Sequence, residues 1–139
     1  MTGRGGNNNN VTSDMLSDSY YFMELTRDVK GFSVGPHTDS QAKWVTTLFY
    51  LPRDRKLVGK GGTLVGKFKD GRKQTGGSTW QSFDGFVPVR RAAFEPNSAL
   101  AFAPCHTSWH AVEAMGGAVV RDTIQGFISS ETKRPKKAC

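Results

Sequence analysis

Hydrophobic and polar residues alternate over short runs along most of the chain, from Phe32 onward. These runs are rich in Val, Thr, Phe and Tyr and are separated by Gly, Pro, Asp and Asn, which is typical of β-strands joined by turns. The predicted strands are 32–37, 44–51, 62–68, 86–91, 99–103, 109–115 and 119–128. No segment after residue 30 shows the 3.6-residue periodicity of an amphipathic helix. The pattern therefore predicts an all-β sandwich, jelly roll or barrel.

The two ends of the chain depart from this pattern. Residues 1–13 are rich in Gly and Asn without periodicity, and we predict that they are disordered. Residues 14–30 are polar and aromatic, which predicts one short helix or strand with minor α content. A length of 139 residues suits one domain. We therefore expect a single domain over 14–130, followed by a basic tail at 131–139.

Alternation within the strands predicts which side chains share a face, because successive side chains of a strand point to opposite sides. In 44–51, one face carries Trp44, Thr46, Leu48 and Tyr50. In 119–128, Arg121 and Thr123 lie two residues apart and point the same way. A guanidinium beside a hydroxyl on an interior face is a receptor suited to a carboxylate.

The net charge of +7 is concentrated in two places. Residues 53–73 hold eight Lys or Arg against two Asp, the tail 133–139 adds four basic residues, and the remainder sums to −3. Two cysteines exclude a disulfide-rich secreted scaffold, and no apolar run is long enough to span a membrane. We therefore expect a cytoplasmic protein that does not enter a membrane.

The three histidines supply the candidate metal chemistry. His37 and Asp39 lie two residues apart on an extended segment, and His110 follows Asp39 by 71 residues in another strand. Two imidazoles and one carboxylate on one face of a metal ion leave three positions open, as in non-haem Fe(II) oxygenases. His106 is the competing candidate for the second histidine, but it lies farther from Arg121, which follows His110 by eleven residues.

Taken together, these motifs resemble the Fe(II)/2-oxoglutarate-dependent dioxygenases, on their prolyl 4-hydroxylase-like side. The resemblance covers about residues 32–129. It rests on PHTDS at 36–40, VTTLFYLP at 45–52, GGTL at 61–64, FEPNSALAFAP at 94–104, WHAV at 109–112 and RDTI at 121–124. It implies a double-stranded β-helix, which is a distorted, cupin-like jelly roll, here with a short or truncated N-terminal segment. Another subunit completing the sheet, in a homo-oligomer, is the alternative to truncation.

The resemblance also implies a metal site and a cosubstrate site. The Fe(II) ligands would be His37, Asp39 and His110. The distal carboxylate of 2-oxoglutarate would pair with Arg121, assisted by the hydroxyls of Thr123 and Tyr50. Leu48 would pack against the cosubstrate, and Phe127 would close the pocket behind Arg121.

The implied activity is hydroxylation of a C–H bond with O2, most directly of a prolyl or other amino-acid residue in a peptide, a protein or a free amino acid. Succinate and CO2 would be the coproducts, and ascorbate is left open as a further cofactor. Family members that halogenate lack the carboxylate ligand, so Asp39 favours hydroxylation. The basic segment 53–73 falls between the second and third predicted strands, and we expect it to hold an acidic substrate or partner.

The alternative is a basic, non-catalytic jelly-roll module that binds an anionic partner, either nucleic acid or an acidic protein. Nucleic acid is disfavoured because residues 53–73 contain only one aromatic residue, Phe68, for base stacking. Relatives that repair nucleobases carry a second Arg where this chain has Phe127. Nucleotide hydrolysis is disfavoured because the near match to a phosphate-binding loop at 61–67 is one residue short and is followed by Phe68.

Overall fold

The computed structural model consists of β-strands and connecting loops, without an α-helix, over the residues it describes: 18–40, 42–53, 55, 58, 60–74, 79–116 and 120–130. In chain order the strands are β1 (Ser19–Asp28), β2 (Val34–His37), β3 (Lys43–Leu51), β4 (Leu64–Phe68), β5 (Phe86–Arg91), β6 (Ala99–Phe102), β7 (Trp109–Val112) and β8 (Arg121–Ser130). The all-β prediction is confirmed, and each of the seven predicted strands corresponds to one of β2 to β8.

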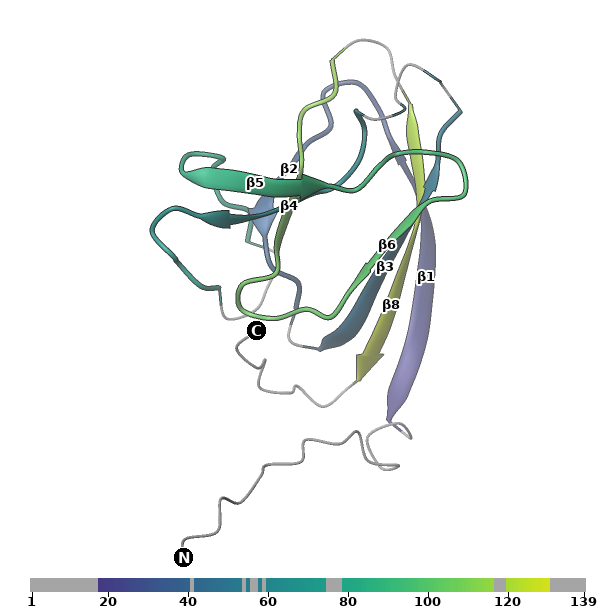
Figure 1. Cartoon of the computed structure of the whole chain (residues 1–139). Helices are drawn as coiled ribbons and strands as arrows, with labels where there is room; N and C mark the ends of the chain where they lie inside the picture. The colour runs from purple at the N-terminus through teal and green to yellow at the C-terminus, as the bar shows by residue number, and fades with distance from the viewer. Residues whose placement is uncertain are drawn as a thin grey trace, which may run out of the picture.

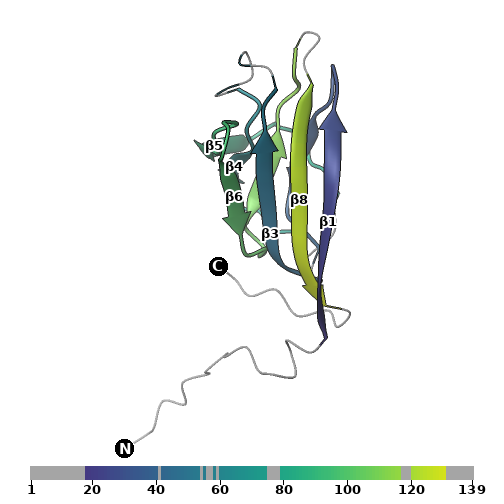
Figure 2. The same cartoon turned by 90° about the vertical axis from the view of Figure 1, so that its right-hand side faces the viewer.

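The strands form two antiparallel sheets. One has the order β1-β8-β3-β6, and the other has the order β2-β7-β4-β5. The four strands of the first sheet lie side by side in Figure 2, and Figure 1 shows the second sheet facing them across the sandwich. Sequence neighbours are repeatedly placed in opposite sheets, which is the connectivity of a jelly-roll, cupin-like sandwich. The predicted fold class is therefore confirmed.

The hydrophobic core lies between the sheets and consists of two clusters. The first contains Leu48, Tyr50, Phe94 and Met115. The second contains Leu64, Phe68, Phe86, Trp109 and Ala111. In β3, the predicted alternation holds, because Thr46, Leu48 and Tyr50 are buried whereas Phe49 and Leu51 are exposed. The inner face of β3 therefore supplies both packing and site residues.

Strand β1 shows that the described part of the segment 14–30 is mainly a strand, and residues 14–17 lie outside the described residues. It pairs with β8 along its whole length, from Ser19 opposite Ser130 to Asp28 opposite Arg121. Because β1 is an edge strand, several of its large side chains stay exposed, with Leu25 at 70%. The last residue of β1, Asp28, matters for the site because it is buried against Arg121. The predictions for 1–13 and 131–139 lie outside the described residues.

The loop between β3 and β4 is fixed by a glycine pair. A Cβ on Gly62 would lie 1.7 Å from the carbonyl oxygen of Ala92, so only glycine fits there. A Cβ on Gly61 would lie 3.3 Å from the ring of Phe94 and 3.7 Å from the side chain of Arg121. This close packing places the Gly61 carbonyl beside the inner face of β8.

Candidate metal and carboxylate site

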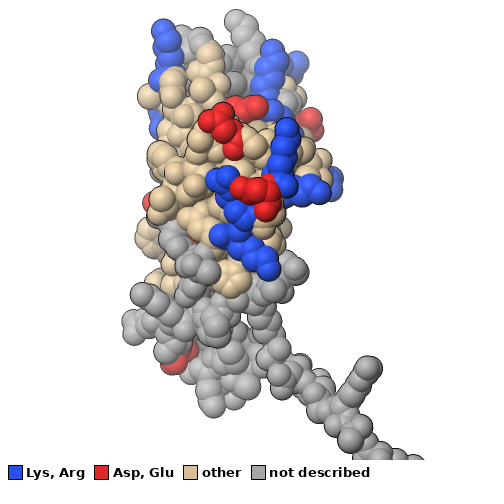
Figure 3. Space-filling model, turned by 90° about the vertical axis from the view of Figure 1, so that its left-hand side faces the viewer, with Lys and Arg blue, Asp and Glu red and all other residues tan. Residues whose placement is uncertain are grey.

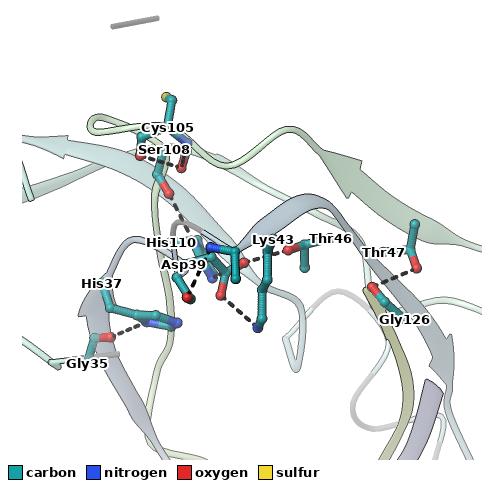
Figure 4. A network of polar contacts seen from close by, with 12 residues as sticks. Gly35, His37, Asp39, Lys43, Thr46, Thr47, Cys105, Ser108, His110 and Gly126 are labelled. Carbon is teal, nitrogen blue, oxygen red and sulfur yellow. Dashed lines mark hydrogen bonds and ion pairs between the residues drawn. The ribbon is translucent and has the colours of Figure 1, made fainter. Parts of the chain in front are cut away.

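The two histidines of the candidate metal site lie on paired strands. His37 is the last residue of β2, His110 is the second residue of β7, and their Cα atoms are partners in the antiparallel register. Asp39 follows β2 by two residues. One ligand atom from each of these three residues can be chosen so that all lie within 4.8 Å of one another. Figure 4 shows the three side chains converging. Strand pairing thus brings together ligands that are 71 residues apart in the sequence.

Hydrogen bonds orient both imidazoles. Nδ1 of His37 lies 3.0 Å from the carbonyl oxygen of Gly35, and Nδ1 of His110 lies 3.0 Å from that of Ser108. Because a carbonyl only accepts, Nδ1 of each ring carries the proton that is donated. The Nε2 atoms are then left with the lone pairs, which is the tautomer that binds a metal ion.

The protonation of His110 also suits metal binding. Burial, together with the nearby His37, lowers the pKa of His110 to about 4, although the carboxylate of Asp39 acts in the opposite direction. The imidazole is therefore neutral at neutral pH. His110 Nε2 lies 3.9 Å from Oδ2 of Asp39, across the space between the ligands.

Asp39 is held as a carboxylate by two side chains of β3. Thr46 donates a hydrogen bond of 2.6 Å to Oδ2, and the ammonium of Lys43 lies 3.1 Å from Oδ1 (Figure 4). Burial raises the pKa of Asp39, but electrostatic interactions with His110 and Lys43 and these hydrogen bonds outweigh burial and lower it below the usual value. The ammonium of Lys43 also lies 3.5 Å above the centre of the Phe127 ring.

The three candidate ligands open onto a cavity of about 260 Å³ between the sheets. Leu48, Arg121 and Phe127 are among its lining residues, and exposed Trp80 lies on its wall. The remaining lining residues are Phe32, Val34, Lys43, Thr46, Thr63, Ala111, Val112 and Gln125. A metal ion and a small acid would therefore share one chamber with two cationic side chains, Lys43 and Arg121.

Arg121 is buried and fixed from several sides. Its Nε donates to the carbonyl oxygen of Gly61 at 2.6 Å, and its Nη1 donates to Oδ2 of Asp28 at 2.5 Å. The rings of Tyr50 and Phe94 have their centres 5.8 Å and 5.5 Å from the guanidinium carbon. The guanidinium thus reaches the cavity already paired with one carboxylate.

Tyr50 and Thr123 are placed near the cavity but do not line it. The Tyr50 hydroxyl donates to Oγ1 of Thr63 at 2.9 Å, and Oγ1 of Thr123 lies 2.6 Å from Oγ1 of Thr26. Both hydroxyls are thus engaged within the protein, and a direct role for them toward a cosubstrate stays a prediction. The competing His106 lies outside the ligand group, with Nδ1 3.2 Å from the carbonyl oxygen of Gln74.

The described Lys and Arg residues of the basic segment 53–73 do not line this cavity. Arg53 forms an ion pair with Asp122 at 2.8 Å on the outer face of the first sheet, and Arg55 and Lys60 are exposed and absent from the cavity wall. Lys56 lies outside the described residues. Figure 3 shows basic side chains beside acidic ones on the face that carries β4 and β5. Among the described residues, the cations that line the cavity are Lys43 and Arg121.

Comparison with known proteins gives distant structural similarities. No protein-family model matches the chain, and no curated protein sequence matches it. An oxidoreductase of the 2OG-Fe(II) oxygenase family from Burkholderia pseudomallei is similar, with a TM-score of 0.47 and 18% identity, over 85% of this chain and 47% of that protein. The chain thus spans about half of that oxygenase. A pilus protein from the disulfide-linked endospore appendages of Bacillus has a TM-score of 0.41 and 11% identity, over 82% of this chain and 89% of that one.

A search for helices that are long and apolar enough to cross a membrane finds none among the described residues.

Proposed function

We propose that the chain is an Fe(II)- and 2-oxoglutarate-dependent dioxygenase, and that it hydroxylates a C–H bond of a prolyl or other amino-acid residue. The observation that carries the proposal is the group formed by His37, Asp39 and His110, whose ligand atoms lie within 4.8 Å of one another and face a cavity. The sequence motifs described above support the same assignment.

The donor set fits Fe(II). Both histidines present Nε2, His110 is neutral, and the pKa of Asp39 is lowered so that the carboxylate is ionised. Neutral imidazoles and one carboxylate are ligands that suit non-haem Fe(II), and three protein ligands leave coordination positions open. The hydrogen bond that Thr46 donates to Asp39 orients the carboxylate, as hydrogen bonds to metal ligands do in known metal sites.

The cavity also offers a receptor for the far end of a dicarboxylic oxoacid. Arg121 lies on its wall, and Leu48 provides apolar packing. When bound, Fe(II) would supply the activation of O2 that couples decarboxylation of the oxoacid to hydroxylation, with succinate and CO2 as coproducts. The residues of this chain would bind and orient the oxoacid and keep bulk water from the chamber.

The substrate would enter the same chamber beside Trp80. Exposed Trp80 and partly buried Phe32 and Val34 line the wall of the cavity, which is a surface suited to an apolar ring such as that of proline. A peptide or a free amino acid would meet this description. Lys43 adds a cation that could pair with an acidic group of the substrate.

The test is turnover of 2-oxoglutarate by Fe(II)-loaded protein against a panel of prolyl peptides and free amino acids, read as succinate formed and as a mass gain of one oxygen. Mn(II) binding, measured by calorimetry, reports the metal site without chemistry. The His110→Ala variant should lose metal binding and turnover. The matched His106→Ala variant should retain both, because His106 lies outside the ligand group.

The assignment fails if the wild-type protein binds neither Mn(II) nor 2-oxoglutarate in the presence of Mn(II). It also fails if His110→Ala binds metal as tightly as the wild-type protein. Metal and oxoacid binding without oxidation of any panel member would leave the metal site standing and overturn the proposed substrate class.

A further inference from the structure

Arg121 is held by contacts that leave little freedom for its guanidinium. Its side chain is 3% exposed, Nε donates to the Gly61 carbonyl, and Nη1 donates to the Asp28 carboxylate. The rings of Tyr50 and Phe94 lie near the guanidinium carbon. An incoming ligand would therefore have to bond to the rest of the guanidinium, which includes Nη2.

Asp28 is therefore an acidic residue of the protein that already occupies part of the carboxylate receptor. Its side chain is 6% exposed, and it is the cross-strand partner of Arg121 in the pairing of β1 with β8. A ligand carboxylate that bonds to Arg121 would bring a second negative charge next to a buried first one. Two carboxylates that share a buried site cannot both stay ionised at little cost, so one of them tends to take up a proton.

We propose that Asp28 is the positioning residue of the carboxylate receptor: it holds Arg121 in place and takes up a proton when a dicarboxylic oxoacid binds there. This inference rests on the proposed function and concerns the protein's own response to the oxoacid. Asp28 does not itself touch the metal ligands or the reacting atoms.

The surroundings of Asp28 favour this role. Burial raises the pKa of Asp28 above its usual value, the hydrogen bond and charge of Arg121 act against burial, and the charge of Asp122 raises the pKa further. Among the described residues, Arg121 is thus the charged group in contact with Asp28, whereas Asp122 acts on it through charge from the opposite face of β8. The neighbouring Arg27 pairs with Asp122 on the outer face of the sheet, and the β3–β4 loop contributes the neutral Gly61 carbonyl to Arg121.

The sign of the pH dependence follows from proton uptake. When binding takes up a proton, affinity rises as the pH falls, by up to tenfold per pH unit between the pKa of Asp28 in the free site and its higher pKa in the complex. The oxoacid adds no such slope above about pH 5.5, because simple carboxylic acids are ionised there. Saturating Mn(II) keeps the metal ligands deprotonated throughout the measurement.

The experiment is calorimetric titration of 2-oxoglutarate into Mn(II)-saturated protein between about pH 5.5 and pH 8. Repeating each titration in buffers with different heats of ionisation counts the protons taken up. For the wild-type protein we expect net proton uptake and a dissociation constant that increases with pH.

The Asp28→Asn variant keeps an acceptor for Arg121 but carries no charge. It should therefore show no proton uptake, and it should bind at every pH as tightly as the wild-type protein binds at the lowest pH. The matched control is Asp122→Asn, which removes a carboxylate from an Asp–Arg pair on the opposite face of the same strand. Asp122→Asn should keep both the proton uptake and the pH dependence, displaced toward lower pH because the charge of Asp122 contributes to the raised pKa of Asp28.

Wild-type binding without proton uptake and without pH dependence would overturn the inference, whether or not Asp28→Asn folds. An Asp28→Asn variant that keeps the wild-type pH dependence would overturn it as well, because another group would then be responsible. Mn(II) binding without any oxoacid binding would instead refute the proposed function, and this inference would fall with it.

Discussion

Lys43 places a positive charge directly beside a candidate metal ligand, and removing that charge should strengthen metal binding. The ammonium lies 3.1 Å from Oδ1 of Asp39. A metal–oxygen bond adds about 2.1 Å, so the ammonium starts within roughly 5 Å of an ion bonded to that oxygen. A divalent ion and the Lys43 ammonium would therefore repel each other, and the Lys43→Met variant should bind the ion more tightly.

The size of the effect can be worked from this separation. At roughly 5 Å, the repulsion between charges of +2 and +1 is about 1.6 kcal/mol in water and about four times larger at an effective dielectric of about 20. The Lys43 side chain is 25% exposed, so it can turn toward solvent and relieve most of the larger figure. We therefore expect the water-like value, which is about a tenfold lower dissociation constant for Mn(II) in Lys43→Met.

Calorimetric titration of Mn(II) into metal-free protein measures this change directly. The Lys43→Arg variant retains the charge and should bind as the wild-type protein does. The orientation of the Asp39 carboxylate survives in both variants through its 2.6 Å hydrogen bond from Thr46. If Lys43→Met bound Mn(II) no more tightly than the wild type, the ammonium could not be repelling the ion.

Three further predictions concern stability of the metal-free protein, measured as the free energy of unfolding in urea. The pKa of His110 is about 4 in the folded chain, and its ordinary value of 6.5 applies to the unfolded chain. On acidification, His110 therefore takes up a proton in the unfolded state before it does so in the folded state. The unfolding free energy should fall by as much as about 3 kcal/mol between these pH values, and a flat profile would contradict this. Thr46→Val should cost about 2 kcal/mol by depriving a buried carboxylate of its donor, whereas Thr47→Val, which loses a neutral hydrogen bond to the Gly126 carbonyl, should cost about 1 kcal/mol. Equal losses of unfolding free energy in Thr46→Val and Thr47→Val would contradict this prediction. Phe94→Ala should cost about 3–5 kcal/mol, because its ring is completely buried, and a loss below 1 kcal/mol would show that the core refills.

Much of this fold could be predicted from local patterns, because residues of strands such as β3, β4 and β6 alternate between a more buried and a more exposed face. The exception is β1, whose residues Tyr20, Tyr21, Phe22 and Met23 are consecutive and apolar. An edge strand that leaves these side chains half exposed produces no alternation, so neither strand nor helix was favoured. Only its pairing with β8 identifies β1 as a strand.

In the candidate site, too, some residues could be predicted from the sequence and others could not. The grouping of His37, Asp39 and His110 was predicted because each residue stands within a short motif of recognisable spacing. Asp28 was missed because its partner Arg121 is 93 residues away, and nothing in a single sequence states which residues a strand register will oppose. The Gly61 carbonyl was missed for a related reason, since a backbone acceptor has no side-chain signature. Lys43 was missed because it lies one residue before the predicted strand 44–51, whereas β3 begins at Lys43 and the Lys43 side chain lines the cavity.

The pairing of β2 with β7 has a consequence for when the chain can hold an ion at all. In the unfolded chain, joining Asp39 to His110 means closing a loop of 71 residues, at an entropic cost of about 4 kcal/mol. In the folded chain, the antiparallel ladder between these strands closes that loop. An ion would therefore distinguish strongly between folded and unfolded chains, and it would bridge a four-residue edge strand to the middle of its sheet. A bound ion would then stabilise the pairing of β2 with β7, and metal binding would depend on the folding of the sheet β2-β7-β4-β5.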